Sequence, residues 1–504
     1  MKLIDDFLDR ITMYRLLLYY LLALLGVAAV LGGLGYMPYS PQAVIGSAAY
    51  LMAACWITNK VFAYILDIPT NYESSLITAL ILSLIITPLS SPQNFVFLSA
   101  AAGLAIASKY LLVIRRQHIF NPAAIAVALT ALGAGQSASW WVGNAQLLPV
   151  VLIGGMLLAR KIRRGQMIVI FLVTSLIASV ILTLMHHGNV IDTTRNLALH
   201  SSAFFLAFVM LTEPLTSPSV VSRQRWYGGL AGLLFPPQVH LLGLFSTPEL
   251  VLVVSNIFAY IIGPRVKLLP QLNQKLTWGP STKDFIFVTD QPFKYKPGQY
   301  MEWTLPHTKT DNRGNRRYFT LASSPTEPNL RLGIKFYAKG SSFKQAMLSM
   351  DRNTQIAAGQ LGGDFTLPAD PARKLAFIAG GIGITPFRSM IKYLVDSDEK
   401  RSVTLLYSEK NPADFAYYDV FKEAKSKLGI KTVYTITDKN VGRYDGVRNG
   451  QITHEMIKAE VPDYLERMFY VSGPHRMVTS LQHELRGLGV QEHNIKIDFF
   501  PGYA

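Results

Sequence analysis

The sequence predicts three consecutive domains: a polytopic α-helical membrane domain of about ten helices in an inverted repeat, an antiparallel β-barrel, and an α/β domain with a parallel sheet. Residues 14–263 contain long apolar stretches with few charges, whereas residues 264–504 have the composition of a soluble protein. Its 504 residues also exceed the roughly 250–300 at which one core stops growing. We expect the membrane domain at 1–263, a linker at 264–275, the barrel at 276–369 and the α/β domain at 370–504.

Ten apolar segments of the first domain are candidates to cross a bilayer, whose hydrocarbon core takes about 20 helical residues. They are residues 14–34, 43–66, 74–90, 94–113, 119–134, 146–160, 167–187, 197–212, 227–245 and 249–263. The first segment lacks the small-residue cleavage pattern of a secretory signal, so we expect it to be the first spanning helix.

The distribution of charge predicts the orientation of this domain. The formal net charge of +16 could by itself indicate a nucleic-acid-binding protein. Much of the excess, however, lies in short loops such as 160–164, whereas the loops 35–42, 91–93 and 135–145 carry no charge. By the positive-inside rule, both termini and the soluble half are expected in the cytoplasm. We therefore expect an integral protein of the bacterial inner membrane, in contact with lipid and without a nucleic-acid partner; the oligomeric state stays open.

The single cysteine, Cys55, excludes an intramolecular disulfide and an iron–sulfur cluster with four Cys ligands from this chain. His186, His187 and His200 are spaced like haem ligands, but Gly188 and the polar residues that follow it indicate a loop. We therefore expect no metal site, and haem is the less favoured alternative.

Two Pro-rich segments suggest an internal repeat. Residues 87–92 (TPLSSP) follow the third candidate span, and residues 212–218 (TEPLTSP) follow the eighth. Because five spans separate them, the two copies would point in opposite directions across the bilayer, as in inverted repeats that bind a ligand at their interface. The alternative is that Pro and Ser simply end helices.

Three segments of this domain carry a resemblance to a known family: residues 72–78 (YESSLIT), 118–124 (HIFNPAA) and 204–218 (FFLAFVMLTEPLTSP). They resemble the RnfD/NqrB family, whose members are membrane components of the Rnf complex and of the sodium-pumping NADH:quinone reductase. This resemblance covers most of residues 14–263 and implies two inverted halves, a membrane flavin, a quinone as partner, and electron transfer coupled to ion movement. The chain lacks the Ser-Gly-Ala-Thr sequence that carries covalent flavin mononucleotide (FMN) in that family. A non-covalent FMN or riboflavin, or no flavin at all, is expected beside Asn121, Thr212, Glu213 and Thr216.

The barrel contains two elements suited to a flavin dinucleotide. In Arg317-Tyr318-Phe319-Thr320, strand geometry brings a cation and an aromatic ring to one face, with a hydroxyl at the strand end. In Gly340-Ser341-Ser342, a turn opens a helix, whose amide groups favour phosphate; an ordinary helix N-cap is the alternative.

With residues 297–300 (PGQY) and 362–365 (GGDF), these elements resemble the ferredoxin–NADP reductase superfamily over residues 275–504. The resemblance implies FAD, with Arg317 at its pyrophosphate, Phe319 against the flavin and Thr320 near N5. Its further FAD-binding residues would be Tyr318, Tyr337, Gly340, Ser341, Ser342 and the tail residue Phe500, whose ring would cover the flavin; a packed end strand is the alternative reading of the tail.

The α/β domain is expected to bind NADH or NADPH. Its first strand ends in Gly380-Gly381-Ile382-Gly383-Ile384-Thr385-Pro386, where glycines let the backbone approach a pyrophosphate and Thr385 is expected to cap a helix. A later strand ends in Ser472-Gly473-Pro474, followed by Met477; Ser472 replaces a Cys that the superfamily places beside the nicotinamide. Ser408 and Lys410 flank Glu409, where we expect contact with the 2′-position of the nucleotide ribose. Between the two nucleotides we favour NADH.

We expect Thr320, Ser472 and Phe500 to act in catalysis, and the chain to be an electron-transferring membrane oxidoreductase. The alternatives are a transporter of a flavin or small solute with an independent or regulatory reductase domain, and a ferric or haem-relay reductase.

Overall fold

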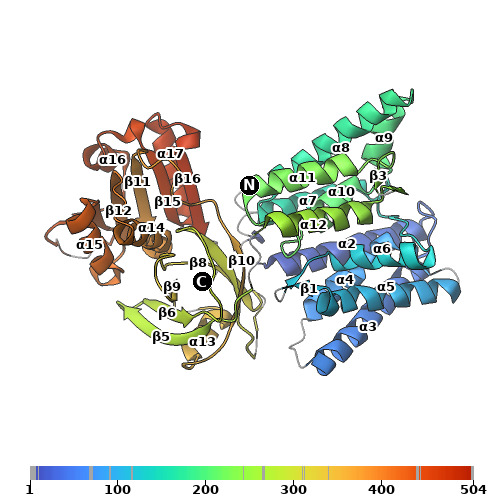
Figure 1. Cartoon of the computed structure of the whole chain (residues 1–504), viewed down its shortest axis with the longest axis horizontal. Helices are drawn as coiled ribbons and strands as arrows, with labels where there is room; N and C mark the ends of the chain where they lie inside the picture. Colours follow the sequence, from blue (N-terminus) through green and yellow to red (C-terminus); the bar gives the residue numbers. More distant parts are fainter. Residues whose placement is uncertain are drawn as a thin grey trace. The chain divides into compact units, whose positions relative to one another are not determined.

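The computed structural model describes residues 7–8, 11–66, 72–89, 92–114, 117–241, 243–263, 267–308, 310–311, 313–338, 340–438, 442 and 444–500. The chain forms two compact units, Met1–Arg265 and Val266–Ala504. Figure 1 shows the first unit as helices coloured from blue to green, and the second as strands and helices coloured from yellow-green to red.

Within the described residues, four helices of the first unit are long and apolar enough to cross a membrane. They are α2 (Met13–Gly33), α3 (Pro41–Leu66), residues Asn94–Leu111 of α5 (Pro92–Leu111), and α8 (Gly165–Met185). The shorter apolar helices are α4 (Tyr72–Ile85), α6 (Pro122–Ala134) and α12 (Pro248–Ile262). The other helices are α7 (Leu148–Ile162), α9 (Val190–Leu199), α10 (Ala203–Phe205), the π-helix η1 (Leu206–Met210) and α11 (Val221–Leu234).

Two of the ten predicted spans are wrong in extent. The span 227–245 ends early, because α11 stops at Leu234 and Pro236 and Pro237 cannot continue a helix. The span 197–212 is broken: α9 ends at Leu199, and the chain resumes as α10 and then widens into the π-turn η1. A π-turn of this kind is often found at functional sites.

The order of elements in the first unit repeats. Helix α4, the Pro-rich segment after it, α5, the hairpin β1 (Val113–Ile114)–β2 (Gln117–His118) and α6 follow one another. The same order returns as α10 with η1, the second Pro-rich segment, α11, the hairpin β3 (His240–Leu241)–β4 (Leu244–Phe245) and α12. Both closing helices begin with a side-chain cap followed by proline, Asn121 for α6 and Thr247 for α12. The predicted repeat therefore recurs in the order of secondary structure.

The second unit begins with two three-stranded antiparallel sheets that enclose one apolar core. One sheet has the order β5 (Gln271–Trp278), β6 (Thr282–Val288), β9 (Leu330–Lys335), and the other β10 (Ala357–Gly362), β7 (Tyr300–Thr304), β8 (Arg316–Thr320). Bridges from Leu268 and Gln271 to residues beside and within β10 join the sheets into a barrel, with α13 (Ser342–Ser349) beside it. The predicted linker, 264–275, is too long, because β5 already begins at Gln271 and pairs with β6.

A six-stranded parallel sheet follows, as predicted. Its order is β14 (Val447–Asn449), β13 (Lys431–Ile436), β12 (Val403–Glu409), β11 (Leu375–Gly380), β15 (Met468–Pro474) and β16 (Ile495–Phe500). The helices between its strands are α14 (Thr385–Asp396), α15 (Tyr418–Leu428), α16 (His454–Glu460) and α17 (His475–Gly487). The order reverses between β11 and β15, the kind of switch point at which open α/β sheets bind ligands beyond the carboxyl ends of their strands.

Candidate functional site

Strand β8 brings Arg317 and Phe319 to one face, as the alternation of a strand predicts. Both contact the buried ring of Phe343 in α13: the guanidinium of Arg317 lies 5.2 Å from its centroid, and the ring of Phe319 lies 5.9 Å from it. Nη1 of Arg317 donates to the carbonyl oxygens of Arg313 and Arg316, both at 2.6 Å. The guanidinium is therefore held in place beside the first turn of α13.

The predicted phosphate turn is the start of α13, and Ser341 is its N-cap. Its hydroxyl accepts from the amide of Lys344 at 3.4 Å, so the N-cap alternative holds for this side chain. The amide of Ser342 donates to the carboxylate of Asp311 at 3.0 Å, and the Ser342 hydroxyl lies 3.0 Å from Nε2 of His307. This helix end therefore already holds a carboxylate, the kind of anion that its amide groups favour.

Three cations surround that helix end: Arg313, Arg317 and Lys344. Arg313 donates to Asp311 at 2.8 Å, and Nη2 of Arg317 lies 4.0 Å from the same carboxylate. Burial, together with the charges of Arg317 and Arg313, lowers the pKa of Lys344 to about 8. Burial would raise the pKa of Asp311, but the Ser342 amide and Arg313 outweigh it and lower that pKa. The site is therefore rich in positive charge, which suits a diphosphate.

The other predicted flavin residues lie on the opposite face of β8 or beyond it. Tyr318 is 48% exposed and meets the edge of Tyr300 at 5.6 Å, and Thr320, at the end of the strand, is buried and in register with Tyr300. Tyr337 is exposed, with the ammonium of Lys344 5.0 Å above its ring. Gly340 has room around its Cα, since an added Cβ would come no closer than 3.5 Å to a neighbour.

The predicted nucleotide turn follows β11 as a 3-10 turn, Gly381–Ile384, that leads into α14. Gly381 has a φ of +57°, a conformation that favours glycine. A Cβ on Gly383 would lie 2.4 Å from the carbonyl oxygen of Ser472, and one on Gly380 would lie 2.2 Å from Sδ of Met477. Gly383 is therefore required by the close approach of the β15 backbone, whereas a side chain on Gly380 would have to displace the flexible end of Met477.

The cap of α14 differs from the prediction. Thr385 is the first helical residue and Ile384 is the N-cap, which makes no side-chain bond. The Thr385 hydroxyl donates to the carbonyl of Ile382 at 3.1 Å, because the 3-10 turn leaves that carbonyl within reach. Pro386 accordingly occupies the second helical position, where it still needs no amide hydrogen.

Ser472, Gly473 and Pro474 end β15 beside this turn. The Ser472 side chain is fully buried, and its Oγ has no hydrogen-bond partner among the described residues. A Cβ on Gly473 would lie 3.0 Å from the carbonyl oxygen of Gly380, so the two strand ends nearly touch. β16 places the backbone of Phe500 in register with Pro474, whereas the Phe500 side chain lies outside the described residues.

The residues expected to contact the 2′-position of the nucleotide ribose differ in burial at the end of β12. Ser408 is buried, and Lys410 is exposed. Glu409 is 4% exposed and accepts from Nζ of Lys335 at 2.8 Å. Burial raises the pKa of Glu409, although Lys335 acts against that rise. The acid on which the expected preference for NADH rests is thus already paired with a lysine of the barrel, which the sequence did not reveal.

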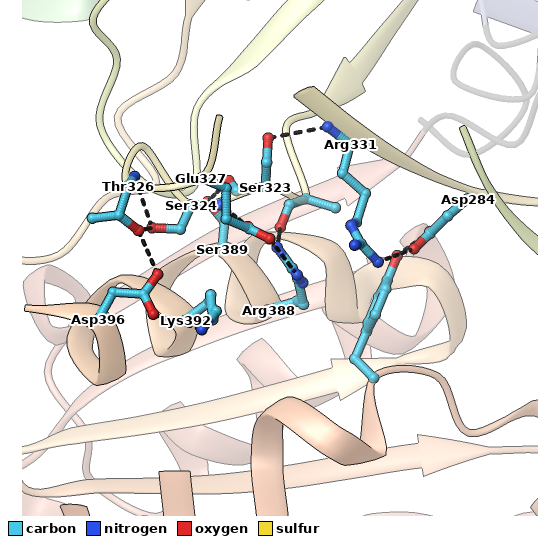
Figure 2. A network of polar contacts seen from close by, with 12 residues as sticks. Asp284, Ser323, Ser324, Thr326, Glu327, Arg331, Arg388, Ser389, Lys392 and Asp396 are labelled. Carbon is cyan, nitrogen blue, oxygen red and sulfur yellow. Dashed lines mark hydrogen bonds and ion pairs between the residues drawn. The ribbon is translucent and has the colours of Figure 1, made fainter. Parts of the chain in front are cut away.

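A polar network that sequence reasoning missed joins the barrel to the α/β domain (Figure 2). Arg388 of α14 forms a two-pronged ion pair with Glu327 and donates to the carbonyl of Ala322 at 2.9 Å. Its neighbour Ser389 donates to the carbonyl of Ser323 at 2.6 Å. These acceptors lie in the segment that directly follows β8, so α14 is bonded to the end of the strand that carries Thr320.

The first unit brings three of its four predicted residues together. Nδ2 of Asn121 and the hydroxyl of Thr216 both donate to one carboxylate oxygen of Glu213, at 2.8 and 3.0 Å. Asn256 of α12, which was not predicted, accepts from the Asn121 amide at 2.8 Å and donates to the carbonyl of Thr216 at 3.2 Å. Thr212 does not join them, because its hydroxyl donates to Phe208 inside the π-turn, at 2.6 Å.

Comparison with known proteins supports the oxidoreductase class predicted for the second unit. Residues 377–483 match the family model described as the oxidoreductase NAD-binding domain. The chain is 27% identical over 217 residues to the glycine betaine monooxygenase reductase subunit of Pseudomonas aeruginosa (strain UCBPP-PA14), a match that covers 42% of this chain and 58% of that protein. It is 28% identical over 222 residues to a flavohemoprotein of Rhodopirellula baltica, with 41% and 53% covered.

A solved structure with a similar fold is the flavohem-like FAD/NAD binding domain of nitric oxide dioxygenase from Vibrio cholerae, with a TM-score of 0.42 and 18% identity. The match covers 46% of this chain and 98% of that one. The chain spans little more than half the length of the two curated relatives.

These findings confirm the predicted class of the second unit, an NAD(P)H-dependent FAD oxidoreductase module with FAD and NAD(P)H as its cofactors. The donor set fits these cofactors, since cations exceed carboxylates among the described residues at α13 and an added Cβ on Gly381 would come no closer than 3.9 Å to a neighbour. The resemblance of the first unit to the RnfD/NqrB family stays a prediction.

Proposed function

We propose that the whole chain is a membrane-bound, NAD(P)H-oxidising flavoprotein that delivers electrons from its reductase module through its membrane unit to a quinone or another acceptor. We extend the proposal to coupling of this transfer with movement of Na⁺ or H⁺. The observation that carries it is the Asn121–Glu213–Thr216–Asn256 cluster, within a unit whose longest helices are apolar. Ionisable groups in such surroundings are functional candidates by default.

In the reductase module, FAD when bound accepts hydride from NAD(P)H and can release the electrons singly. Arg317 would bind the diphosphate from its fixed place beside α13, and Thr320 would donate a hydrogen bond at the reacting edge of the flavin. Ser472 has a free hydroxyl beside the glycine turn, where it would orient the nicotinamide. None of these residues needs to act as a general base.

In the membrane unit, the polar cluster offers the donors and acceptors that a flavin ring edge requires. The side-chain amide of Asn121 and the hydroxyl of Thr216 donate to the Glu213 carboxylate, and the Asn256 side chain bonds the backbone of Asn121 and Thr216. A non-covalent FMN or riboflavin that bound there would replace some of these hydrogen bonds with bonds to its own polar edge. In an apolar unit this replacement is favourable only if each buried polar group keeps a hydrogen-bond partner.

The flavin content of the purified full chain tests this proposal. Protein in detergent would be extracted with acid, and the flavins separated and counted per chain. FAD together with FMN or riboflavin would support a relay through the membrane unit. FAD alone would contradict the proposed membrane flavin.

A second measurement tests electron delivery. In proteoliposomes, NADH oxidation should require a quinone, and Glu213→Gln should lower this quinone-dependent rate while ferricyanide reduction by the module stays unchanged. Glu455→Gln, at an exposed position in the second unit, is the matched control. Quinone-independent oxidation that builds no ion gradient would contradict the proposal and favour a transporter with an independent reductase domain.

A further inference from the structure

Lys344 is a cation with no carboxylate partner among the described residues. It lies in the first turn of α13, two residues after the Ser342 amide that bonds to Asp311. Its ammonium donates to the carbonyl of Lys335 at 2.8 Å and lies 5.0 Å above the ring of Tyr337, and both are neutral groups. The side chain is therefore partly removed from water without a compensating charge.

The neighbours of Lys344 make this position still less favourable for a charge. Arg317 and Arg313 are close enough that their charges lower the pKa of Lys344, which burial already lowers. Asp311 is the carboxylate at this helix end, and it is held by the Ser342 amide and by Arg313. Among the described residues, this helix end thus carries three cations beside one carboxylate, a set that suits a bound dianion.

Gly340 lies beside Lys344 at the turn that opens α13. An added Cβ on Gly340 would meet the carbonyl oxygen of Tyr337 at 3.5 Å and Cβ of Lys344 at 3.9 Å, both ordinary van der Waals contacts. The turn is therefore packed against the base of the Lys344 side chain but is not overcrowded there.

We propose that Lys344 binds the FAD diphosphate together with Arg313 and Arg317, and that FAD binding takes up a proton from solvent, which converts the neutral amine of Lys344 to an ammonium. This inference rests on the proposed flavin site and adds a ligand to it. The balance is simple: a neutral amine gains one proton from the buffer, and no covalent bond of FAD changes. The other titratable groups facing this helix end are Asp311 and His307.

Titration calorimetry of FAD into the flavin-depleted full chain tests the proposal. At pH 8, where about half of Lys344 is neutral in the free site, binding should take up about half a proton. The uptake is obtained from the difference in heat between two buffers of unlike ionisation enthalpy. Lys344→Met should abolish the uptake and raise the Kd for FAD by about 10- to 100-fold, the usual loss for a bond to a charged group.

Three further variants separate this role from a structural one. Lys344→Arg should keep an affinity close to that of the native chain and yet take up no proton, because arginine stays charged. Lys425→Met, on the exposed face of α15, and His307→Gln should leave the uptake unchanged. Proton uptake that persisted in Lys344→Arg would overturn the proposal. Failure of the native chain to bind FAD would instead overturn the proposed function.

Discussion

Gly383 offers a sharp test of the nucleotide site. An alanine there would bring a Cβ to 2.4 Å from the Ser472 carbonyl oxygen and 2.6 Å from the Gly473 amide nitrogen, both backbone atoms. Ordinary contact begins at 3.4 Å, so the turn after β11 must move by 3.4 − 2.4 = 1.0 Å. A misplacement of about 1 Å near reacting groups can cost about 100-fold in rate, and crowding a packed site costs about 1–3 kcal/mol.

We therefore expect Gly383→Ala to lower the rate of flavin reduction by NADH by about 100-fold, while FAD stays bound to the barrel. Anaerobic stopped-flow bleaching of the flavin measures the rate, and the visible spectrum gives the FAD content. Gly487→Ala, at the end of α17, is the control, because nothing lies within 4 Å of its added Cβ. Native reduction kinetics in Gly383→Ala would refute the assignment of this turn to NAD(P)H.

The remaining predictions concern the flavin site and the joint beside it. Arg317→Ala should lower FAD retention during gel filtration by about 10-fold or more, because a charge-assisted phosphate contact is lost, and unchanged FAD occupancy would refute that role. Thr320→Ala should slow flavin reduction more than it weakens FAD binding; an unaltered reduction rate in stopped flow would remove Thr320 from the mechanism. Burial would raise the pKa of Glu327, but its pairing with Arg388 lowers that pKa below 4.5. The pair therefore stabilises the fold above pH 4.5, and this contribution is lost as the pH falls through the lowered pKa. Arg388→Met should destabilise the module by about 3 kcal/mol at neutral pH and flatten the acid limb of its thermal denaturation profile below about pH 5; an unchanged acid limb would show that the pair is not responsible.

The local motifs of the reductase module could be predicted because each lies within a few residues of sequence. Arg317 and Phe319 share a face of β8 as strand alternation requires, and the glycines of the turn after β11 are explained by the backbone that they approach. The exact cap of α14 could not be predicted, because the 3-10 turn that precedes it moves the helix start by one residue.

Long-range pairs escaped prediction for a different reason. Glu409 pairs with Lys335, 74 positions away, and Asp284 accepts from Tyr417, 133 positions away. A single sequence carries no signal for such partners. The same limit applies in the first unit, where Glu249 is 2% exposed and accepts from the indole of Trp140, 109 positions away, at 2.7 Å.

The Asn121–Glu213–Thr216–Asn256 cluster shows what a short motif can and cannot reveal. Asn121, Glu213 and Thr216 were named together from short motifs of the RnfD/NqrB resemblance, and they are hydrogen-bonded. Asn256 was missed because it lies inside an apolar helix whose start is marked by Thr247 and Pro248, with no local sign of a functional residue. Thr212 lies outside the hydrogen-bonded cluster, because its hydroxyl donates to the carbonyl of Phe208 in the π-turn.

The bonds from Arg388 and Ser389 to the segment after β8 have a consequence for the geometry of the module. Helix α14, which starts at the nucleotide turn, and the segment that follows Thr320 are joined by a charged pair and by two hydrogen bonds from side chains to backbone carbonyls. The placement of the nucleotide turn relative to Thr320 is therefore set when the module folds.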